Sequence, residues 1–275
     1  MKIKVLKFGG TSVGSIEAIK RSADIIHDWS KKSKVIAVLS AMSGETDRLI
    51  NLTKSFSKNP NPIDFDNAIS SGENVSCALM SICLNNQKIK AKSLLSWQIP
   101  IITSSEHMKS RILSINKKFL YDELENFEVL LIPGFQGINN KGELTTLGRG
   151  GSDTSAVAVA AAMETECIIY TDVEGVFTTD PNIVPKAKKI NKISYEEMLE
   201  LASQGAKVLQ TRSVELAMRK NTKLSVRSSF KPKKIGTMIT DEKSVLENNT
   251  VSGITYSKDE AKITLSRVQD KPGVS

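Results

Sequence analysis

The sequence predicts an α/β protein built on a mainly parallel sheet with helices on both faces. Short β-prone runs alternate with helical patterns along most of the chain, and this order is typical of parallel sheets. The chain has 275 residues, of which 40% are apolar, so it can bury a large core in one long domain or in two smaller ones.

The first half of the chain contains the clearest alternation. β-prone runs occur in the opening segment that ends at Lys7 and in residues 34–39, 91–95, 99–103 and 128–132. Helical patterns lie between them: one of roughly four turns beginning near Ser12 or Ser15, one after the loop 40–47, and one over 64–84, interrupted near 70–73. An Asn-Pro-Asn-Pro sequence at 59–62 separates the last two.

The second half continues this pattern and ends in a change of composition. Helices are predicted at residues 154–164, 194–202 and 211–220, and strands at residues 167–171 and 223–227. Residues 172–181 form a long turn-rich segment after a strand, which is where open α/β sheets place ligands. Residues 241–249 are polar and have the character of a linker.

Charge and composition exclude several classes of function. The net charge of +8 comes from scattered lysines and only 5% of residues are aromatic, so we expect no nucleic-acid partner. His27 and His107 are the only histidines, too few for a histidine metal site or a serine–histidine triad, and we expect each at the surface or at a cap. Three widely spaced cysteines indicate reduced, mostly buried thiols. No apolar run reaches the roughly 20 residues that span a bilayer, so we expect no membrane partner and a cytoplasmic location.

Two glycine-rich turns are candidates for binding phosphates. Residues 146–153 (TLGRGGSD) precede a helix of small residues, whose free N–H groups and positive dipole end point at the turn. Residues 7–14 (KFGGTSVG) form a second strand-turn-helix, with Lys7 at the end of the strand. The alternatives are a plain structural turn, a solvated Lys7, and an Asp153 that only caps its helix.

Taken in order, six segments resemble one family closely: the aspartate kinases of the amino-acid kinase superfamily. They are residues 7–12 (KFGGTS), 40–42 (SAM), 71–73 (SGE), 148–153 (GRGGSD), 170–185 (beginning YTDV) and 204–209 (QGAKVL). The resemblance extends over nearly the whole chain. It implies a three-layer sandwich with a mainly parallel central sheet, as in carbamate kinase.

The resemblance also implies a reaction, the transfer of the γ-phosphoryl group of ATP to the side-chain carboxylate of L-aspartate. This is the first step toward lysine, threonine, methionine and diaminopimelate. A carboxylate is already an ionised nucleophile at neutral pH, so the scarcity of histidines is no obstacle. The site must instead supply positive charge and N–H dipoles. Mg²⁺ is expected with ATP, held mainly by phosphate oxygens and water, and no carboxylate cluster identifies protein ligands for it.

By the same resemblance, Lys7 and Asp153 are the catalytic candidates. Lys7 would lie against the β- and γ-phosphates, and Asp153 would organise the cationic residues and the substrate. Arg149 would grip the α-carboxylate of aspartate, and Glu73 would accept a hydrogen bond from its α-ammonium group. Further candidates for hydrogen bonds to the substrate are Ser40, Thr46 and Ser152, residue types that also cap turns and helices.

The resemblance assigns a larger group of residues to the nucleotide. They are Lys7, Gly9, Gly10, Thr171, Asp172, Phe177, Asp180, Asn182 and Lys207. Two of them depart from the family pattern, because Phe177 stands where many relatives carry Tyr and Asn182 stands where Arg is frequent. We therefore expect a lower nucleotide affinity.

We divide the chain into a catalytic domain over residues 1–230, a linker over 231–250, and an incomplete start of an ACT-like regulatory domain over 251–275. One or two strands without covering helices cannot bury an apolar face, so we expect the last segment to be loose, swapped or paired with another chain. A complete regulatory domain would imply a homo-oligomer. The alternative is that these residues add an edge strand to the main domain.

Three other functions stay open at this stage. The chain could be another small-molecule kinase of the superfamily, acting on glutamate, acetylglutamate or a nucleoside monophosphate. It could be a binding protein that holds ATP without consuming it. A nucleic-acid binder, suggested by net charge alone, would show steep salt dependence on DNA or RNA.

Overall fold

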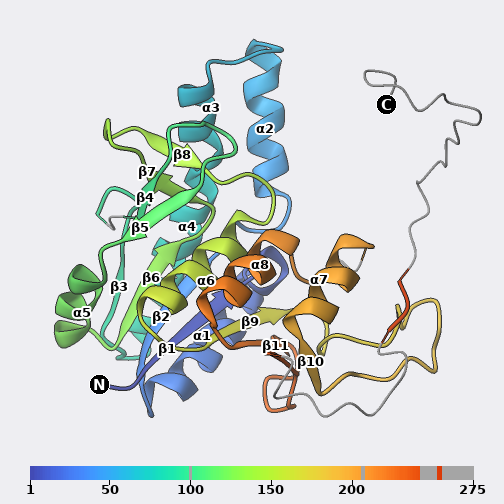
Figure 1. Ribbon diagram of the computed structural model, residues 1–275. Helices are drawn as coiled ribbons and strands as arrows, with labels where there is room; N and C mark the ends of the chain where they lie inside the picture. Colours follow the sequence, from blue (N-terminus) through green and yellow to red (C-terminus); the bar gives the residue numbers. More distant parts are fainter. Residues whose placement is uncertain (99–100, 206–207, 242–252, 256–275) are drawn as a thin grey trace, which may run out of the picture.

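The computed structural model describes residues 1–98, 101–205, 208–241 and 253–255 (Figure 1). Its centre is an eight-stranded sheet with the strand order β10-β12-β11-β9-β1-β2-β6-β3. All neighbouring strands are parallel except β11 and β12, which are antiparallel. In chain order the strands are β1 (Ile3–Phe8), β2 (Lys34–Leu39), β3 (Ala91–Ser93), β6 (Val129–Pro133), β9 (Cys167–Thr171), β10 (Lys192–Ser194), β11 (Leu224–Ser228) and β12 (Thr237–Thr240).

Helices cover both faces of this sheet, as expected for a three-layer sandwich. Alternate residues of β1 point to opposite faces: Leu6 packs in the core beneath α1 (Ile16–Ser30) and α4 (Ser71–Asn86), and Val5 in the core on the other face. That second core is covered by α5 (Lys117–Asn126), α6 (Gly151–Ala162), α7 (Tyr195–Ser203) and α8 (Thr211–Lys220). No helix in the described ranges combines the length and the apolar character that a membrane crossing requires.

Local sequence explains where the covering helices begin. The side chain of Ser15 accepts a hydrogen bond from the amide of Ala18 and so caps α1, one of the two starts that the sequence suggested. A capping box formed by Ser194 and Glu197 starts α7. Both helices therefore start at residues whose side chains satisfy free backbone amides.

A second, smaller sheet lies beyond one end of the central sheet, beside two further helices (Figure 1). Its order is β5-β4-β7-β8, formed by β4 (Ile101–Thr103), β5 (Ile112–Ile115), β7 (Gln136–Ile138) and β8 (Leu144–Thr146). The helices are α2 (Glu45–Phe56) and α3 (Pro62–Ile69). Of these strands the sequence indicated only β4, which lies within the β-prone run 99–103, whereas β5, β7 and β8 lie in no such run.

The expected linker over residues 231–250 is wrong in its first part. β12 lies between β10 and β11 in the central sheet, with Ile239 and Thr237 fully buried. The Thr237 hydroxyl accepts from the amide of Val176 and donates to the carbonyl of Ile190, so this polar residue is satisfied inside the sheet. The central sheet therefore extends to residue 240.

Most of the expected regulatory segment, residues 251–275, lies outside the described residues, as do residues 242–250 of the expected linker. Residues 253–255 are described, and the amide of Ile254 donates to the carbonyl of Thr178 at 2.7 Å. The Thr255 hydroxyl donates to the carbonyl of Gln204, just after α7.

Candidate active site

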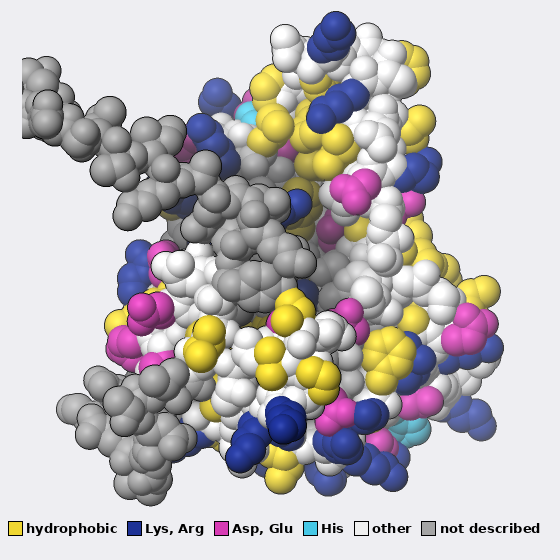
Figure 2. Space-filling model, turned by 90° about the vertical axis from the view of Figure 1, so that its right-hand side faces the viewer, with side chains coloured by type: hydrophobic (Ala, Val, Ile, Leu, Met, Phe, Trp, Pro, Cys, Tyr) yellow, Lys and Arg dark blue, Asp and Glu magenta, His cyan; other side chains and the backbone are white. Residues whose placement is uncertain are grey.

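The carboxyl ends of the parallel strands gather the candidate residues at one edge of the central sheet. β1, β2 and β9 are adjacent and parallel, so the segments that follow them, Gly9-Gly10, Ser40 and Asp172, start at the same edge. Figure 2 shows that the molecule is hollowed between its upper and lower parts, with cationic and acidic side chains visible inside the hollow. This edge is where an open α/β sheet offers a ligand site.

An ion pair joins the two glycine-rich turns. Lys7 Nζ lies 2.6 Å from Asp153 Oδ1, and the two side chains are only 12% and 10% exposed. Asp153 Oδ1 makes no aligned hydrogen bond within the described chain, so the contact is electrostatic. The pair excludes a solvated Lys7, and Asp153 is no helix cap, because α6 is preceded by Gly150 and has no side-chain cap.

Tight packing brings the start of α6 to the sheet edge. Gly148 and Gly150 have φ of +77° and +73°, the left-handed conformation that glycine adopts without strain. Ser152, which is buried, lies so close to Gly134 after β6 that a Cβ on Gly134 would stand 2.7 Å from the Ser152 Cβ. The N–H groups of the first turn of α6 thus lie next to the ends of β6 and β1.

Glu73 is a buried carboxyl group with an unused acceptor. It is 3% exposed in the first turn of α4 and accepts a hydrogen bond from the amide of Ala41, the residue after Ser40. Burial raises the pKa of Glu73 to about 8. Its Oε2 has no hydrogen-bond partner in the part of the chain that the structure describes. Such a group is suited to receiving a cationic ligand, which would satisfy Oε2 and offset the desolvation of the carboxylate.

The other substrate candidates differ in exposure. Arg149 is exposed in the glycine-rich turn, between Gly148 and Gly150. Ser40 is half-buried directly after β2, and Thr46 is half-buried in the first turn of α2.

The nucleotide candidates fall into two groups. Gly9, Gly10, Thr171 and Asp172 lie together at the sheet edge, where the Gly9 amide donates to the carbonyl of Tyr170. A Cβ on Gly9 would stand 3.5 Å from Lys7 Nζ, so the glycine leaves the space beside the ammonium open. The second group, Phe177, Asp180 and Asn182, lies in the connection between β9 and β10 and makes contacts within that connection. Lys207 lies outside the described residues.

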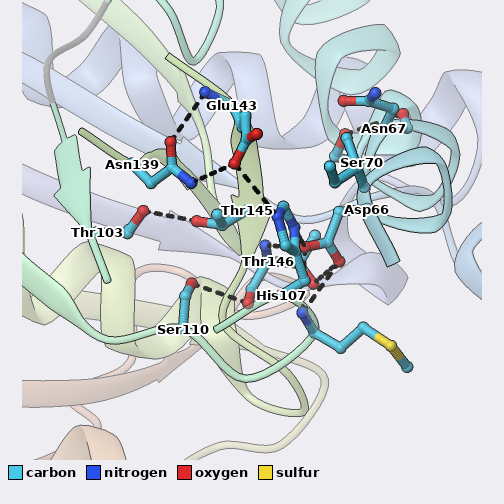
Figure 3. A network of polar contacts seen from close by, with 12 residues as sticks. Asp66, Asn67, Ser70, Thr103, His107, Ser110, Asn139, Glu143, Thr145 and Thr146 are labelled. Atoms are coloured by element: carbon cyan, nitrogen blue, oxygen red, sulfur yellow. Dashed lines mark hydrogen bonds and ion pairs between the residues drawn. The ribbon is translucent and has the colours of Figure 1, made fainter. Parts of the chain in front are cut away.

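The sequence analysis missed a buried polar network beside the glycine-rich turn (Figure 3). His107, expected at the surface or at a cap, instead has a side chain only 13% exposed, with Nδ1 2.8 Å from the fully buried Asp66 of α3. Asp66 also accepts from Met108 and Thr146. The one sign in the sequence is that Asp66 shares the apolar face of α3 with Phe65 and Ile69.

The described residues contain no group of three or more His, Cys, Asp and Glu side chains that could hold a metal ion. A magnesium ion bound through nucleotide phosphates and water does not require such a group. All three cysteines are free thiols, with Cys77 and Cys167 buried and Cys83 half-buried, as the sequence indicated.

Comparison with known proteins shows the family to which the chain belongs. A sequence model of the amino acid kinase family matches residues 2–228. An aspartate kinase of Pseudomonas putida is 48% identical over 278 residues, which cover 100% of this chain and 67% of that protein. The chain belongs to the aspartate kinases of the amino acid kinase family.

Solved aspartate kinases have the same fold. E. coli aspartokinase III, in complex with aspartate and ADP, superposes with a TM-score of 0.77 at 28% identity, covering 88% of this chain and 65% of that one. An aspartate kinase from Synechocystis gives a TM-score of 0.77 at 40% identity, covering 90% of this chain and 40% of that one. The chain thus spans about two thirds of the length of the Pseudomonas putida relative and of the E. coli enzyme.

Proposed function

We propose that this chain transfers the γ-phosphoryl group of ATP to the side-chain carboxylate of L-aspartate, giving 4-phospho-L-aspartate and ADP. The observation that supports this most directly is the Lys7–Asp153 ion pair, which brings both glycine-rich turns to one edge of the sheet. The relatives of this chain are named aspartate kinases, and the structure of E. coli aspartokinase III was solved in complex with aspartate and ADP.

The transfer requires positioning and charge stabilisation more than proton transfer. A side-chain carboxylate oxygen of aspartate attacks the γ-phosphorus, the bond from phosphorus to the β,γ-bridging oxygen breaks, and the electron pair leaves on ADP. Lys7 Nζ stabilises the charge on the phosphoryl oxygens, together with the amides of Gly9 and Gly10 and the first turn of α6. Asp153 holds the ammonium group of Lys7 at the mouth of the site. No proton is taken from the nucleophile, so no general base is needed.

Recognition of aspartate uses one group of each charge. The Arg149 guanidinium binds the α-carboxylate through paired hydrogen bonds, and Glu73 accepts from the α-ammonium group. The unpaired Oε2 of Glu73 supports this role. Ser40, Thr46 and Ser152 contribute hydrogen bonds from the surrounding loops and helix starts.

ATP binds across the ends of β1 and β9. Gly9, Gly10 and Lys7 contact the phosphates, and a second set contacts the base, ribose or remaining phosphates: Thr171, Asp172, Phe177, Asp180, Asn182 and Lys207. Mg²⁺ bound together with ATP would supply further positive charge to the phosphates, and phosphate oxygens and water would hold it. Because the substrates are ATP and a soluble metabolite, we expect the protein to act in the cytoplasm. With a complete regulatory domain, we expect it to form a homo-oligomer.

The decisive experiment traps the product. The chain is incubated with ATP, Mg²⁺, L-aspartate and hydroxylamine, and the acyl phosphate is detected as its hydroxamate. We expect hydroxamate with aspartate, and none when aspartate is omitted or replaced by glutamate or acetylglutamate. ATP binding without hydroxamate from any of these acids would instead indicate a catalytically idle binding protein.

A further inference from the structure

The turn that carries Arg149 is anchored through Thr146, the last residue of β8. The Thr146 amide donates to Asp66 Oδ2 at 3.0 Å, and the Thr146 hydroxyl donates to Asp66 Oδ1 at 2.6 Å. The Thr146 carbonyl accepts from both the amide and the hydroxyl of Ser110. Every hydrogen-bonding group of Thr146 therefore has a partner from another segment (Figure 3).

Asp66, which accepts the two hydrogen bonds from Thr146, is itself fixed by further contacts. Its side chain is fully buried and accepts from the amide of Met108 and from the amide and hydroxyl of Thr146, and its Oδ2 lies 2.8 Å from His107 Nδ1. Glu143 lies on the other side of the imidazole, 3.7 Å from Nε2, and accepts from Asn139. A buried carboxylate with all its donors in place is held rigidly, since leaving any one of them unpaired is costly.

The far side of the same turn is held by Arg212 of α8. Its Nη1 donates to the carbonyl of Leu147 and its Nη2 donates to the carbonyl of Ser110, each at 2.8 Å. Arg149 is thus the exposed residue of a turn whose backbone is fixed from both directions.

Asp66 belongs to the same helical pair as Glu73. It lies in α3, which runs directly into α4, and Glu73 is in the first turn of α4. The Asp66–Thr146 bonds therefore connect the helices that carry Glu73 to the turn that carries Arg149.

We propose that Asp66 is a positioning residue for aspartate, which fixes Arg149 relative to Glu73 so that the two meet opposite ends of the α-amino acid. Asp66 touches no reacting atom and acts through Thr146. The effect on aspartate binding rests on the function proposed above, whereas the anchoring of the turn does not.

The test compares Asp66→Asn with Arg149→Lys and with the double variant, using Asp64→Asn, exposed on the same helix, as the matched control. Loss of a hydrogen bond to a charged group corresponds to about a tenfold change, so we expect Asp66→Asn to raise the aspartate KM by about tenfold and to leave the ATP KM unchanged. In the Arg149→Lys background the further rise should be small, because both changes remove the same contact. The proposal is overturned if Asp66→Asn lowers kcat and Tm by the same amount in the wild-type and Arg149→Lys backgrounds and leaves the aspartate KM unchanged.

Thr146→Val and hydrogen exchange provide a second variant and a second measurement. Should Asp66→Asn fail to fold, Thr146→Val removes one donor with little change of shape and should raise the same KM by less. Hydrogen exchange of residues 144–151 should be faster in either variant than in the wild type and the control. If the wild type makes no acyl phosphate from aspartate, the proposed function fails, and exchange alone then decides on Asp66: unchanged exchange overturns the anchoring role.

Discussion

At the scale of single residues, Lys7 is the residue to which we assign the stabilisation of the transferring phosphoryl group. It lies 2.6 Å from Asp153, at the edge where the glycine-rich turns meet. We expect Lys7→Ala to lower kcat by about a hundredfold or more, since removal of one such electrostatic donor typically has that effect. The measurement is the rate of hydroxamate formation at saturating substrates.

Lys4 provides the control for this change, because it lies on the same strand and also pairs with a carboxylate, Glu166, at the opposite end from the site. Lys4→Ala should keep most of the activity. A Lys7→Ala chain with more than roughly a tenth of the wild-type rate would contradict the role given to Lys7.

We expect Glu73 to make aspartate binding depend on pH. Its pKa of about 8 means that the carboxyl group is mostly protonated at neutral pH in the free protein, whereas an α-ammonium group requires the carboxylate. Binding therefore expels a proton below pH 8, and the aspartate KM should fall by up to about tenfold per pH unit as the pH rises toward about 8, then level off.

The measurement is the aspartate KM across this range, compared with Glu73→Gln, which cannot titrate. The variant should have a high KM without the slope. The same slope in both proteins would assign the proton to another group.

Arg149 should be sensitive even to a change that keeps its charge. Lysine cannot offer the paired, planar donors that match a carboxylate, so Arg149→Lys should raise the aspartate KM by about tenfold, the worth of one hydrogen bond to a charged group. Steady-state kinetics with varied aspartate measures this. A shift in the ATP KM alone would instead place Arg149 on the phosphates.

Residues of this site differed in how visible they were in the sequence. Lys7 and Asp153 lie in glycine-rich strand-turn-helix segments, so the local sequence indicated both. The family resemblance then implied a catalytic role for each. Asp66 was not visible, because its partners His107 and Thr146 are 41 and 80 residues away and no periodicity expresses such a contact. Buried polar networks between distant segments are the part of a site that a single sequence conceals.

At the scale of elements, the glycine-rich turn over residues 146–153 packs so closely against Gln210 that a side chain at Gly150 has no room. A Cβ on Gly150 would stand 2.1 Å from the Cγ of Gln210, the residue that precedes α8. Gly150→Ala should therefore displace the turn or the start of α8, lowering both activity and Tm. Gly142 is the matched control, because it has φ of +79° and no atom within 4 Å of the added Cβ.

Gly142→Ala should lose only the roughly 1–2 kcal/mol of a left-handed alanine and keep its activity. Thermal unfolding and the hydroxamate assay distinguish the two variants. Equal losses in both would show that backbone strain, and not contact with Gln210, explains the effect.

Elements differed in predictability according to how clear a pattern each one carries in its own sequence. The predicted limits of β2, β9 and α8 agree with the structure, because each element is a continuous apolar run or a clear amphipathic pattern. The sequence analysis missed β5, β7 and β8, which have three or four residues, and also α5, whose buried residues in the helix are only Leu120 and Leu124. The small sheet arises from pairing between segments and not from their own patterns.

At the scale of the whole molecule, β12 places the end of the central sheet beyond residue 230. It separates β10 from β11, so a chain of residues 1–230 would lose both pairings and the buried side chain of Ile239, worth about 1.5–3 kcal/mol by itself. We expect a chain of residues 1–245 to unfold cooperatively, and one of residues 1–230 to have a much lower Tm or no cooperative transition. Circular dichroism during heating tests this, and equal Tm values would restore the boundary at residue 230.

In the Lys7–Asp153 pair, the carboxylate of Asp153 is a fixed counterion of the Lys7 ammonium group. Because the two charges cancel where phosphates are expected, a chloride or an inorganic phosphate entering alone gains less than it would beside an unpaired lysine. A nucleotide that also contacts the residues after β9 makes several favourable interactions at once. We therefore expect the pairing to favour large polyphosphates over the small anions of the surrounding solution.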